Sequence, residues 1–160
     1  MCGFAGFLTN NTNLLANAEP IANKMAKTIE HRGPDDSGVW IDDSSGIVLA
    51  HRRLSIVDLS PAGHQPMTSK SDRFTLVFNG EIYNYKDLKS TYLSDFSFKS
   101  SGDTEVIVEL FNKYGTESFK WLKGMFAFSI YDHINCKMYL CRDGIGIKPL
   151  YYYANDTEFY

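Results

Sequence analysis

The stretch that decides the fold runs from residue 104 to residue 143 and reads TEVIVELFNKYGTESFKWLKGMFAFSIYDHINCKMYLCRD. Its first part, from Thr104 to Tyr114, repeats apolar residues on one helical face. Asp103 stands where an N-cap is expected, and Gly115 can end the helix. The segments MFAFSIYD and KMYLCRD then read as two strands joined by HINC. A helix followed by neighbouring strands departs from the βαβ alternation of a parallel sheet.

The rest of the chain leads to the same fold class. Strands are expected in CGFAGFL, VWI, GIVLAHRRLSIV and FTLVFNGEIYNY, the last with a break at Asn79-Gly80, and helices from Pro20 to about Glu30 and from Lys86 to Leu93. GIGIKPLYYY turns and begins a further strand. Because strands, helices and strands cluster in turn, the sequence predicts an α+β fold with largely antiparallel sheets.

Size and composition set the broad class. The chain has 160 residues, 44% of them hydrophobic and 22% charged, which suits one globular domain. A net charge of −3 and a pI of about 5.8 argue against nucleic acid as a partner. With neither a membrane-spanning run nor a signal peptide in the sequence, we expect no membrane partner and a cytoplasmic location. The chain stops at TEFY just after a strand has begun, so we expect the domain to be incomplete at its C-terminus.

Cysteine and histidine spacing speaks against disulfides and metals. The three cysteines, Cys2, Cys136 and Cys141, contain no C-x-x-C, and on one strand the last two would face opposite sides. The loop HRGPDDSG is rich in turn formers. Its acidic and histidine residues lack metal-ligand spacing, so we predict no metal site and interpret the loop as a structural one shaped around a site.

Cys2 is the first candidate for chemistry because it follows the initiator methionine. A thiol attacks only as thiolate, and free cysteine is mostly protonated at neutral pH, so a base is needed. If Met1 is removed, the α-amine of Cys2 can take the proton directly or through water. From position alone, an incidental residue at the chain end is the competing interpretation.

Asn79-Gly80 and nearby charged residues supply candidate partners. A break in a strand can aim a side-chain amide and a backbone N–H at one point, which suits an oxyanion, although Asn-Gly is also a common hairpin turn. Arg53 or Arg52 can bind a carboxylate with a bidentate fork. Asp103 can bind an ammonium group or simply cap a helix, and Glu81 is similarly ambiguous.

Seven ordered blocks carry a family resemblance. MCGFAGF, HRGPDDSG, AHRRLSIVDLSPAGHQPM, FNGEIYNY, SGDTEVIVEL, LKGMFAFSIYD and RDGIGIKPLYY resemble the glutaminase domain of class II glutamine amidotransferases, in the branch of the glutamine-hydrolysing asparagine synthetases. The resemblance implies an N-terminal-nucleophile hydrolase fold, a four-layer αββα sandwich with two antiparallel sheets. Residues 1–160 would then be one glutaminase domain, lacking the ATP-dependent synthetase domain.

The resemblance also implies roles for individual residues. Cys2 would attack the side-chain amide of glutamine, and Asn79 with the Gly80 N–H would form the oxyanion hole. Arg53, rather than Arg52, would hold the α-carboxylate of glutamine. Around its α-ammonium the resemblance places Glu81 and Asp103, and the pocket wall it implies consists of Leu54, Ser55, Ile56 and Val57.

The resemblance further bounds cofactors and partners. The glutaminase reaction would need no cofactor, while ATP and Mg²⁺ would serve only the absent synthetase domain, which receives the ammonia. A homodimer of the full-length enzyme is a further implied partner. Sugar-modifying amidotransferases share these blocks, so the ammonia acceptor stays open, and Gly144 departs from the larger residue usual in its block. The alternatives are a non-catalytic module that retains Met1 and an N-terminal-nucleophile amidase for another substrate.

Overall fold

A computed structural model describes residues 2–160, and its strands form two antiparallel sheets of four strands each. The strand orders are β2-β3-β1-β8 and β4-β5-β6-β7. The elements in chain order are β1 (Gly3–Thr9), α1 (Thr12–Leu15), α2 (Ala18–Thr28), η1 (Glu30–Arg32), β2 (Asp36–Asp42), β3 (Ile47–Arg53), η2 (Pro61–Gly63), β4 (Met67–Thr68), β5 (Phe74–Ile82), α3 (Tyr85–Tyr92), α4 (Thr104–Tyr114), η3 (Gly115–Trp121), β6 (Gly124–Asp132), β7 (Lys137–Arg142) and β8 (Glu158–Phe159).

Helix α2 covers the outer face of the first sheet. Its buried positions are Ala18, Ala22 and Ala26, which recur every four residues and let the helix lie close against β1 and β3. The helix begins at Ala18 rather than at the predicted Pro20, and the short α1 before it was not predicted. The alanines therefore define the inner face of α2, while Ile21 and Met25 pack at its margin.

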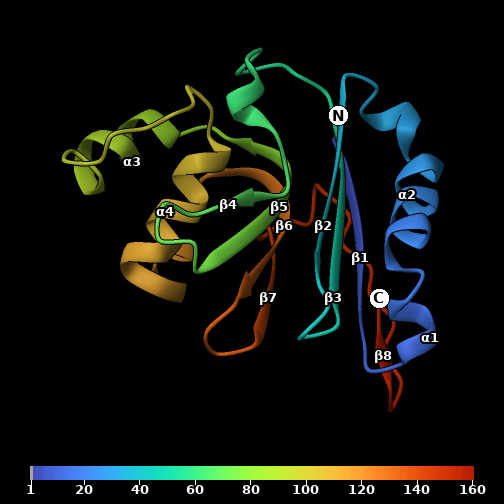
Figure 1. The fold of residues 1–160 in the computed structure, drawn as a ribbon. Coiled ribbons are helices and arrows are strands. Elements are labelled where there is room, and N and C mark those ends of the chain that lie inside the picture. Colours follow the sequence, from blue (N-terminus) through green and yellow to red (C-terminus); the bar gives the residue numbers. More distant parts are fainter. Residues whose placement is uncertain (1) are drawn as a thin grey trace.

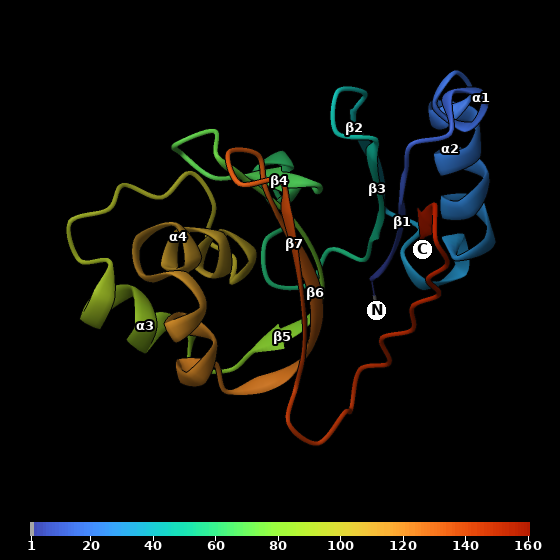
Figure 2. The ribbon, with the colours of Figure 1, turned by 90° about the horizontal axis from the view of Figure 1, so that it is seen from below.

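Helices α3 and α4 cover the second sheet and close the largest core. Helix α4 begins and ends where the sequence predicts, and all its residues from Thr104 to Phe111 are buried. Its apolar side chains meet those of β5 and β6 in one cluster that includes Phe78, Leu110 and Phe128. Figures 1 and 2 show the resulting order of layers: α2, the first sheet, the second sheet, then α3 and α4.

A smaller core joins the two sheets face to face. Ile47 and Leu49 of β3 meet Val77 of β5 and Tyr131 of β6 there. With helices outside both sheets, the molecule is the predicted four-layer αββα sandwich. No helix in the described part of the chain has both the length and the apolar character needed to cross a bilayer.

Three local expectations are wrong. Strand β5 runs unbroken through Asn79-Gly80, because Gly80 lies opposite Phe126 so closely that a Cβ would come within 2.6 Å of the Phe126 Cα. The segment 151–153 is not a strand, and the final strand is the two-residue β8. Strand β3 ends at Arg53, so the strand expected in GIVLAHRRLSIV does not continue through residues 54–57. Cys136 lies in the turn before β7 at a φ of 50°, within the expected linker HINC, and so shares no strand with Cys141. All three cysteines are free, as predicted.

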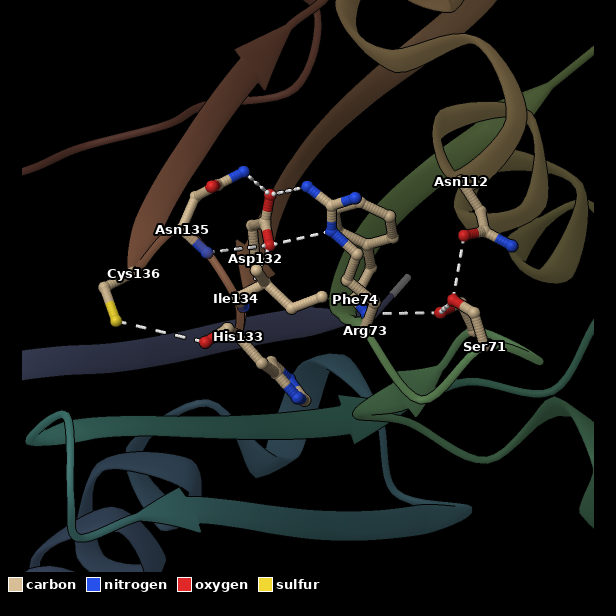
Figure 3. A network of polar contacts seen from close by, with 10 residues as sticks. Ser71, Arg73, Phe74, Asn112, Asp132, His133, Ile134, Asn135 and Cys136 are labelled. Carbon is tan, nitrogen blue, oxygen red and sulfur yellow. Dashed lines mark hydrogen bonds and ion pairs between the residues drawn. The ribbon is translucent and has the colours of Figure 1, made fainter.

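The connection between β6 and β7 is anchored to the start of β5 (Figure 3). The carboxylate of Asp132 accepts hydrogen bonds from Arg73 Nε at 3.0 Å and from Arg73 Nη2 at 2.8 Å. It also accepts from the backbone N–H of Ile134 and the side-chain amide of Asn135. The Arg73 guanidinium and these donors hold the pKa of Asp132 well below its usual range, against the opposing effect of burial. The network fixes the hairpin that carries β7.

His51 of β3 connects the two sheets through a buried hydrogen bond. The side chain is 0% exposed, and its Nε2 lies 3.0 Å from the Phe78 carbonyl oxygen of β5. Since a carbonyl only accepts, Nε2 carries the proton. Burial lowers the pKa of His51 from 6.5 to about 4. The imidazole is therefore neutral in the folded protein at pH 7.

We expect His51 to make the fold acid-sensitive between pH 6.5 and pH 4. In that window the unfolded chain binds a proton at His51 that the folded chain does not, so the free energy of unfolding falls as pH falls. The full difference is worth up to about 3 kcal/mol. Denaturant unfolding at pH 7, 6, 5 and 4.5 measures it.

His51→Gln is the control for that experiment, because its amide keeps a donor for the Phe78 carbonyl and does not titrate. Asp36, His64 and Arg53 also act on His51, and they remain in both proteins. The wild type should lose about 2 kcal/mol more than the variant over the range. Equal losses in the two proteins would contradict the assignment.

Candidate active site

One pocket, to which both sheets contribute, brings together five residues predicted as functional. Its lining includes Cys2, Arg53, Asn79, Gly80 and Asp103. The predicted wall residues Leu54, Ile56 and Val57 also line it, as does Glu81, which was predicted near the α-ammonium of glutamine. Ser55 is not among the lining residues, and its backbone N–H donates to Asp35 Oδ2 at 2.8 Å.

The thiol of Cys2 lies against the end of β3. Gly3 pairs with Arg52 in the β1–β3 register, so Cys2 is carried alongside the residues that follow β3. The Leu54 N–H donates to Cys2 Sγ at 3.3 Å, and the Cys2 carbonyl accepts from Arg32 Nε at 3.1 Å. The position suits a nucleophile held in place at both its backbone and its side chain.

The free edge of β5 presents backbone N–H groups to the pocket. Strand β4 pairs with Thr75 and Leu76, and no other strand in residues 2–160 pairs with that side of β5 beyond Leu76. Alternate residues of a strand direct their N–H to the same edge. The Phe78 N–H donates to Gln65 Oε1 at 2.7 Å, and the Ile82 N–H donates to Asp103 Oδ2 at 2.8 Å.

Gly80 lies between these two donors and therefore directs its N–H to the same edge. Phe126, the residue opposite Gly80 on β6, supports this orientation because its backbone bonds to Asp143 and not to Gly80. The Phe126 N–H donates to Asp143 Oδ2, and the Phe126 carbonyl accepts from the Asp143 N–H. Gly80 lines the pocket. Its N–H is thus a backbone donor aimed at the space that also contains the Cys2 thiol.

Asn79 completes this wall of the pocket. The residue is 5% exposed, and its Oδ1 is buried without a hydrogen-bond partner among the residues that the structure describes. Buried polar side chains are normally hydrogen-bonded, so the unpaired oxygen is an exception. Asn79 lines the pocket, which makes its carboxamide a candidate contact for a bound ligand.

Arg53 is wrapped by the loop that follows it. Its Nη1 donates to the Ser60 carbonyl at 2.9 Å, and its Nη2 donates to the Asp58 carbonyl. A guanidinium has five N–H donors, so the two bonds orient the group without exhausting it. Gly63 lies against the same guanidinium, where an added Cβ would come within 2.6 Å of Cζ. A side chain at residue 63 would therefore require the guanidinium or the loop to shift.

Asp103 is a buried carboxylate at the pocket wall. It occupies the N-cap position of α4, as predicted, but makes no side-chain cap bond and accepts from Ile82 instead. Burial, and secondarily the carboxylate of Glu81, raises the pKa of Asp103. A bound cation in the pocket would favour its ionised form. The Asp103 carboxylate and the Arg53 guanidinium thus offer opposite charges to one ligand.

Arg52 faces away from this pocket, in agreement with the choice of Arg53. Its Nε donates to the Gly33 carbonyl at 3.0 Å, and its Nη2 pairs with Glu30 at 3.1 Å. The loop HRGPDDSG braces the site, as predicted, because Asp35 N also donates to the Arg53 carbonyl at 3.0 Å. Residues 2–160 bring together no group of three or more His, Cys, Asp or Glu side chains able to hold a metal ion.

The sequence analysis missed several further pocket residues, among them Gly63, Gln65 and Lys148. Gln65 and Gly63 come from the turn-rich segment and Lys148 from the block RDGIGIKP. Lys148 is buried, and its backbone is fixed because the Asp143 carboxylate accepts its N–H at 3.0 Å and that of Ile147 at 2.9 Å. The family blocks contain all three residues, but no pattern in a single sequence separates them from loop residues.

Comparisons with known proteins agree with the geometry. A family model described as a glutamine amidotransferase domain matches residues 1–160. A putative glutamine-hydrolysing asparagine synthetase of Methanocaldococcus jannaschii is 40% identical, over 99% of this chain and 33% of its own length. Asparagine synthetase 1 of Bacillus subtilis is 38% identical, over 100% of this chain and 25% of its own.

A third relative carries a different name. The amidase chry2 of Gibberella zeae is 35% identical, over 99% of this chain and 25% of its own length. The chain thus spans a third or less of the length of these curated relatives. Since the family model covers the whole chain and the five predicted residues share one pocket, the protein belongs to the glutamine amidotransferase domain family, with similarity to the glutamine-hydrolysing asparagine synthetases.

Proposed function

We propose that this domain hydrolyses the side-chain amide of free glutamine to glutamate and ammonia, with Cys2 as the nucleophile. The observation that carries the proposal is the shared pocket: the Cys2 thiol and the Gly80 N–H face a space that also contains Arg53 and Asp103. Free glutamine carries an amide, an α-carboxylate and an α-ammonium, and each has a complementary group there.

The chemistry requires two additions to the amide carbon. Cys2 sulfur bonds to the carbon, and the carbonyl oxygen becomes an oxyanion that accepts from the Gly80 N–H and the Asn79 carboxamide. The C–N bond then breaks, and the nitrogen leaves as ammonia after taking the proton lost by the thiol. Water adds to the thioester, the C–S bond breaks, and glutamate leaves with the thiol restored.

The proposed base is the α-amine of Cys2. It requires removal of Met1, and Met1 lies outside the described residues. A free α-amine ionises near neutral pH and can exchange a proton with the adjacent thiol. Because thiol, amine and water supply every atom of the reaction, the proposal includes no cofactor for this step.

The proposal extends to the acceptor of the ammonia. Relatives that are three to four times as long as the matched region are named asparagine synthetases, which supports a synthetase domain on a longer protein, with ATP and Mg²⁺ serving that domain and aspartate as the acceptor. A sugar-linked acceptor is the competing outcome. A cytoplasmic setting is supported by the three free cysteines.

Truncated substrates test the proposal. Glutaramate lacks the α-ammonium of glutamine, and 4-aminobutanamide lacks the α-carboxylate. We expect kcat/KM for each to lie about a hundredfold or more below that for L-glutamine, because each leaves a buried charge of the pocket unpaired. Ammonia release by Met1-processed protein measures all three.

Asp103→Asn provides the matched control, because its amide oxygen still accepts from Ile82. The variant should lose most of its activity on glutamine while keeping its low activity on glutaramate. Equal rates on glutamine and the two truncated amides would identify an amidase for another substrate. No hydrolysis of any of them by processed protein would favour a non-catalytic module.

A further inference from the structure

Gln65 is a buried carboxamide in the pocket that the proposed reaction does not use. The residue is 3% exposed and lies in the segment between η2 and β4. Its Oε1 accepts from the Phe78 N–H at 2.7 Å, and its Nε2 lies 3.5 Å from Thr104 Oγ1 at the start of α4. The first contact is short and buried, so it is the stronger of the two.

Two buried side chains bind the backbone of Phe78, an arrangement that we call a clamp. The hydrogen bond from the Phe78 N–H to Gln65 is the first of its two contacts. The carbonyl of the same residue accepts from His51 Nε2 of the other sheet at 3.0 Å. Both backbone polar groups of Phe78 are therefore held by buried side chains, one on the pocket side and one between the sheets. Phe78 directly precedes Asn79 and Gly80, so the clamp fixes the start of the predicted oxyanion hole.

The backbone of β5 needs these side-chain hydrogen bonds because strand pairing does not hold it at this edge. Strand β4 pairs with Thr75 and Leu76, and beyond Leu76 no strand of the described chain forms a ladder with this side of β5. Oxyanion donors act within about 2.7–3.1 Å of the developing charge, and displacements of a few tenths of an ångström weaken them. The side chain of Gln65 supplies the acceptor that a neighbouring strand would otherwise provide for the Phe78 N–H.

We propose that Gln65 is a positioning residue, which sets the Gly80 N–H and the Asn79 carboxamide in place for the oxyanion by holding the Phe78 N–H. The inference rests on the proposed glutaminase function and deepens it. Gln65 touches the backbone of β5 rather than the reacting atoms, so its loss acts on the transition state more than on the binding of the amino acid.

The experiment compares three variants of Met1-processed protein. Gln65→Met removes the acceptor at similar volume, and Gln65→Glu keeps an acceptor. Ser69→Ala is the matched control, because Ser69 Oγ accepts the Phe74 N–H at 3.1 Å at the far end of the same strand. The measurements are kcat and KM for glutamine, the Kd of glutamate, and the inhibition constant of glutamate γ-semialdehyde. This aldehyde adds the Cys2 thiol to give a tetrahedral hemithioacetal, which places an oxygen in the oxyanion hole.

We expect Gln65→Met to lower kcat and aldehyde affinity together by about tenfold to a hundredfold, with glutamate Kd changing less than about threefold. Gln65→Glu should lie closer to the wild type. Ser69→Ala should lower the melting temperature without changing either catalytic readout. If Gln65→Met does not fold, Gln65→Asn, whose shorter side chain does not reach Phe78, must show the loss in aldehyde affinity.

Two results would overturn the inference. One is a Gln65→Met or Gln65→Asn variant that folds and retains full aldehyde affinity; the other is a loss of glutamate binding in these variants as large as the loss of aldehyde binding. Failure of the proposed function gives a different result, because the wild type itself would then release no glutamate from glutamine.

Discussion

Replacing Cys2 by alanine is expected to abolish glutamine hydrolysis, with kcat falling on the order of 10⁴-fold or more. The thioester cannot form without the sulfur, and the remaining pocket supplies only binding and oxyanion donors. The side chain contributes little to the fold, since within residues 2–160 its hydrogen bonds are with the backbone of Leu54. Glutamate release, followed on protein whose loss of Met1 is verified by intact mass, measures the effect.

The control for this variant is substrate binding. Cys2→Ala keeps Arg53 and Asp103, so its Kd for glutamine should lie within about threefold of the wild-type KM. The comparison holds when the chemical step is slow relative to substrate dissociation, because KM then equals Kd. Protein that retains Met1 should be as inactive as the alanine variant, because its Cys2 has no α-amine. Glutaminase activity that persists in Cys2→Ala would rule out the nucleophile.

Gly63→Ala is expected to have the second largest effect, lowering kcat/KM for glutamine by about a hundredfold. The added Cβ would overlap the guanidinium of Arg53, which is 7% exposed and held by the carbonyls of Asp58 and Ser60. Either the guanidinium or the loop must move, and both changes withdraw the cation from its place in the pocket. The lower kcat/KM should come mainly from a higher KM, since Arg53 is proposed to bind the α-carboxylate and not the reacting amide.

Gly144→Ala is the matched control, because a Cβ at that position meets no other heavy atom within 4 Å. It should leave kcat/KM within about twofold of the wild type and the melting temperature unchanged or slightly raised. Comparable losses in the two alanine variants, or a Gly63→Ala enzyme with normal KM, would contradict the role given to the Arg53 loop.

Hydrophobic periodicity predicted those helices and strands that bury one apolar face and expose the other. Helix α4 agrees with its predicted bounds because an apolar stripe, an N-cap position and a C-terminal glycine all coincide. The break at Asn79-Gly80 was wrong because local turn propensity yielded to the pairing of β5 with β6, which needs a residue without Cβ opposite Phe126. Tertiary contacts of that kind are invisible in one sequence.

The site could be predicted only as far as the family blocks reach. Reasoning from residue types left Arg52 and Arg53 equal, and the alternation of β3, which turns Arg52 toward Glu30, separates them in the structure. Gln65 gave no signal, because its role lies in one long-range hydrogen bond to the backbone of Phe78. Side chains that act by holding a distant backbone leave no periodicity or motif of their own.

The edge of β5 also decides how large a substrate can be. A peptide that adds to a sheet edge needs a run of alternate N–H and C=O groups along several residues. At this edge Gln65 and Asp103 already occupy the N–H groups on either side of Gly80. A polypeptide that contains glutamine therefore cannot pair with this edge as an added strand. The same two side chains also prevent the edge from pairing with a strand of another chain. The hydrogen bonds that shape the proposed glutamine pocket therefore leave no continuous edge on which a peptide could pair as a strand.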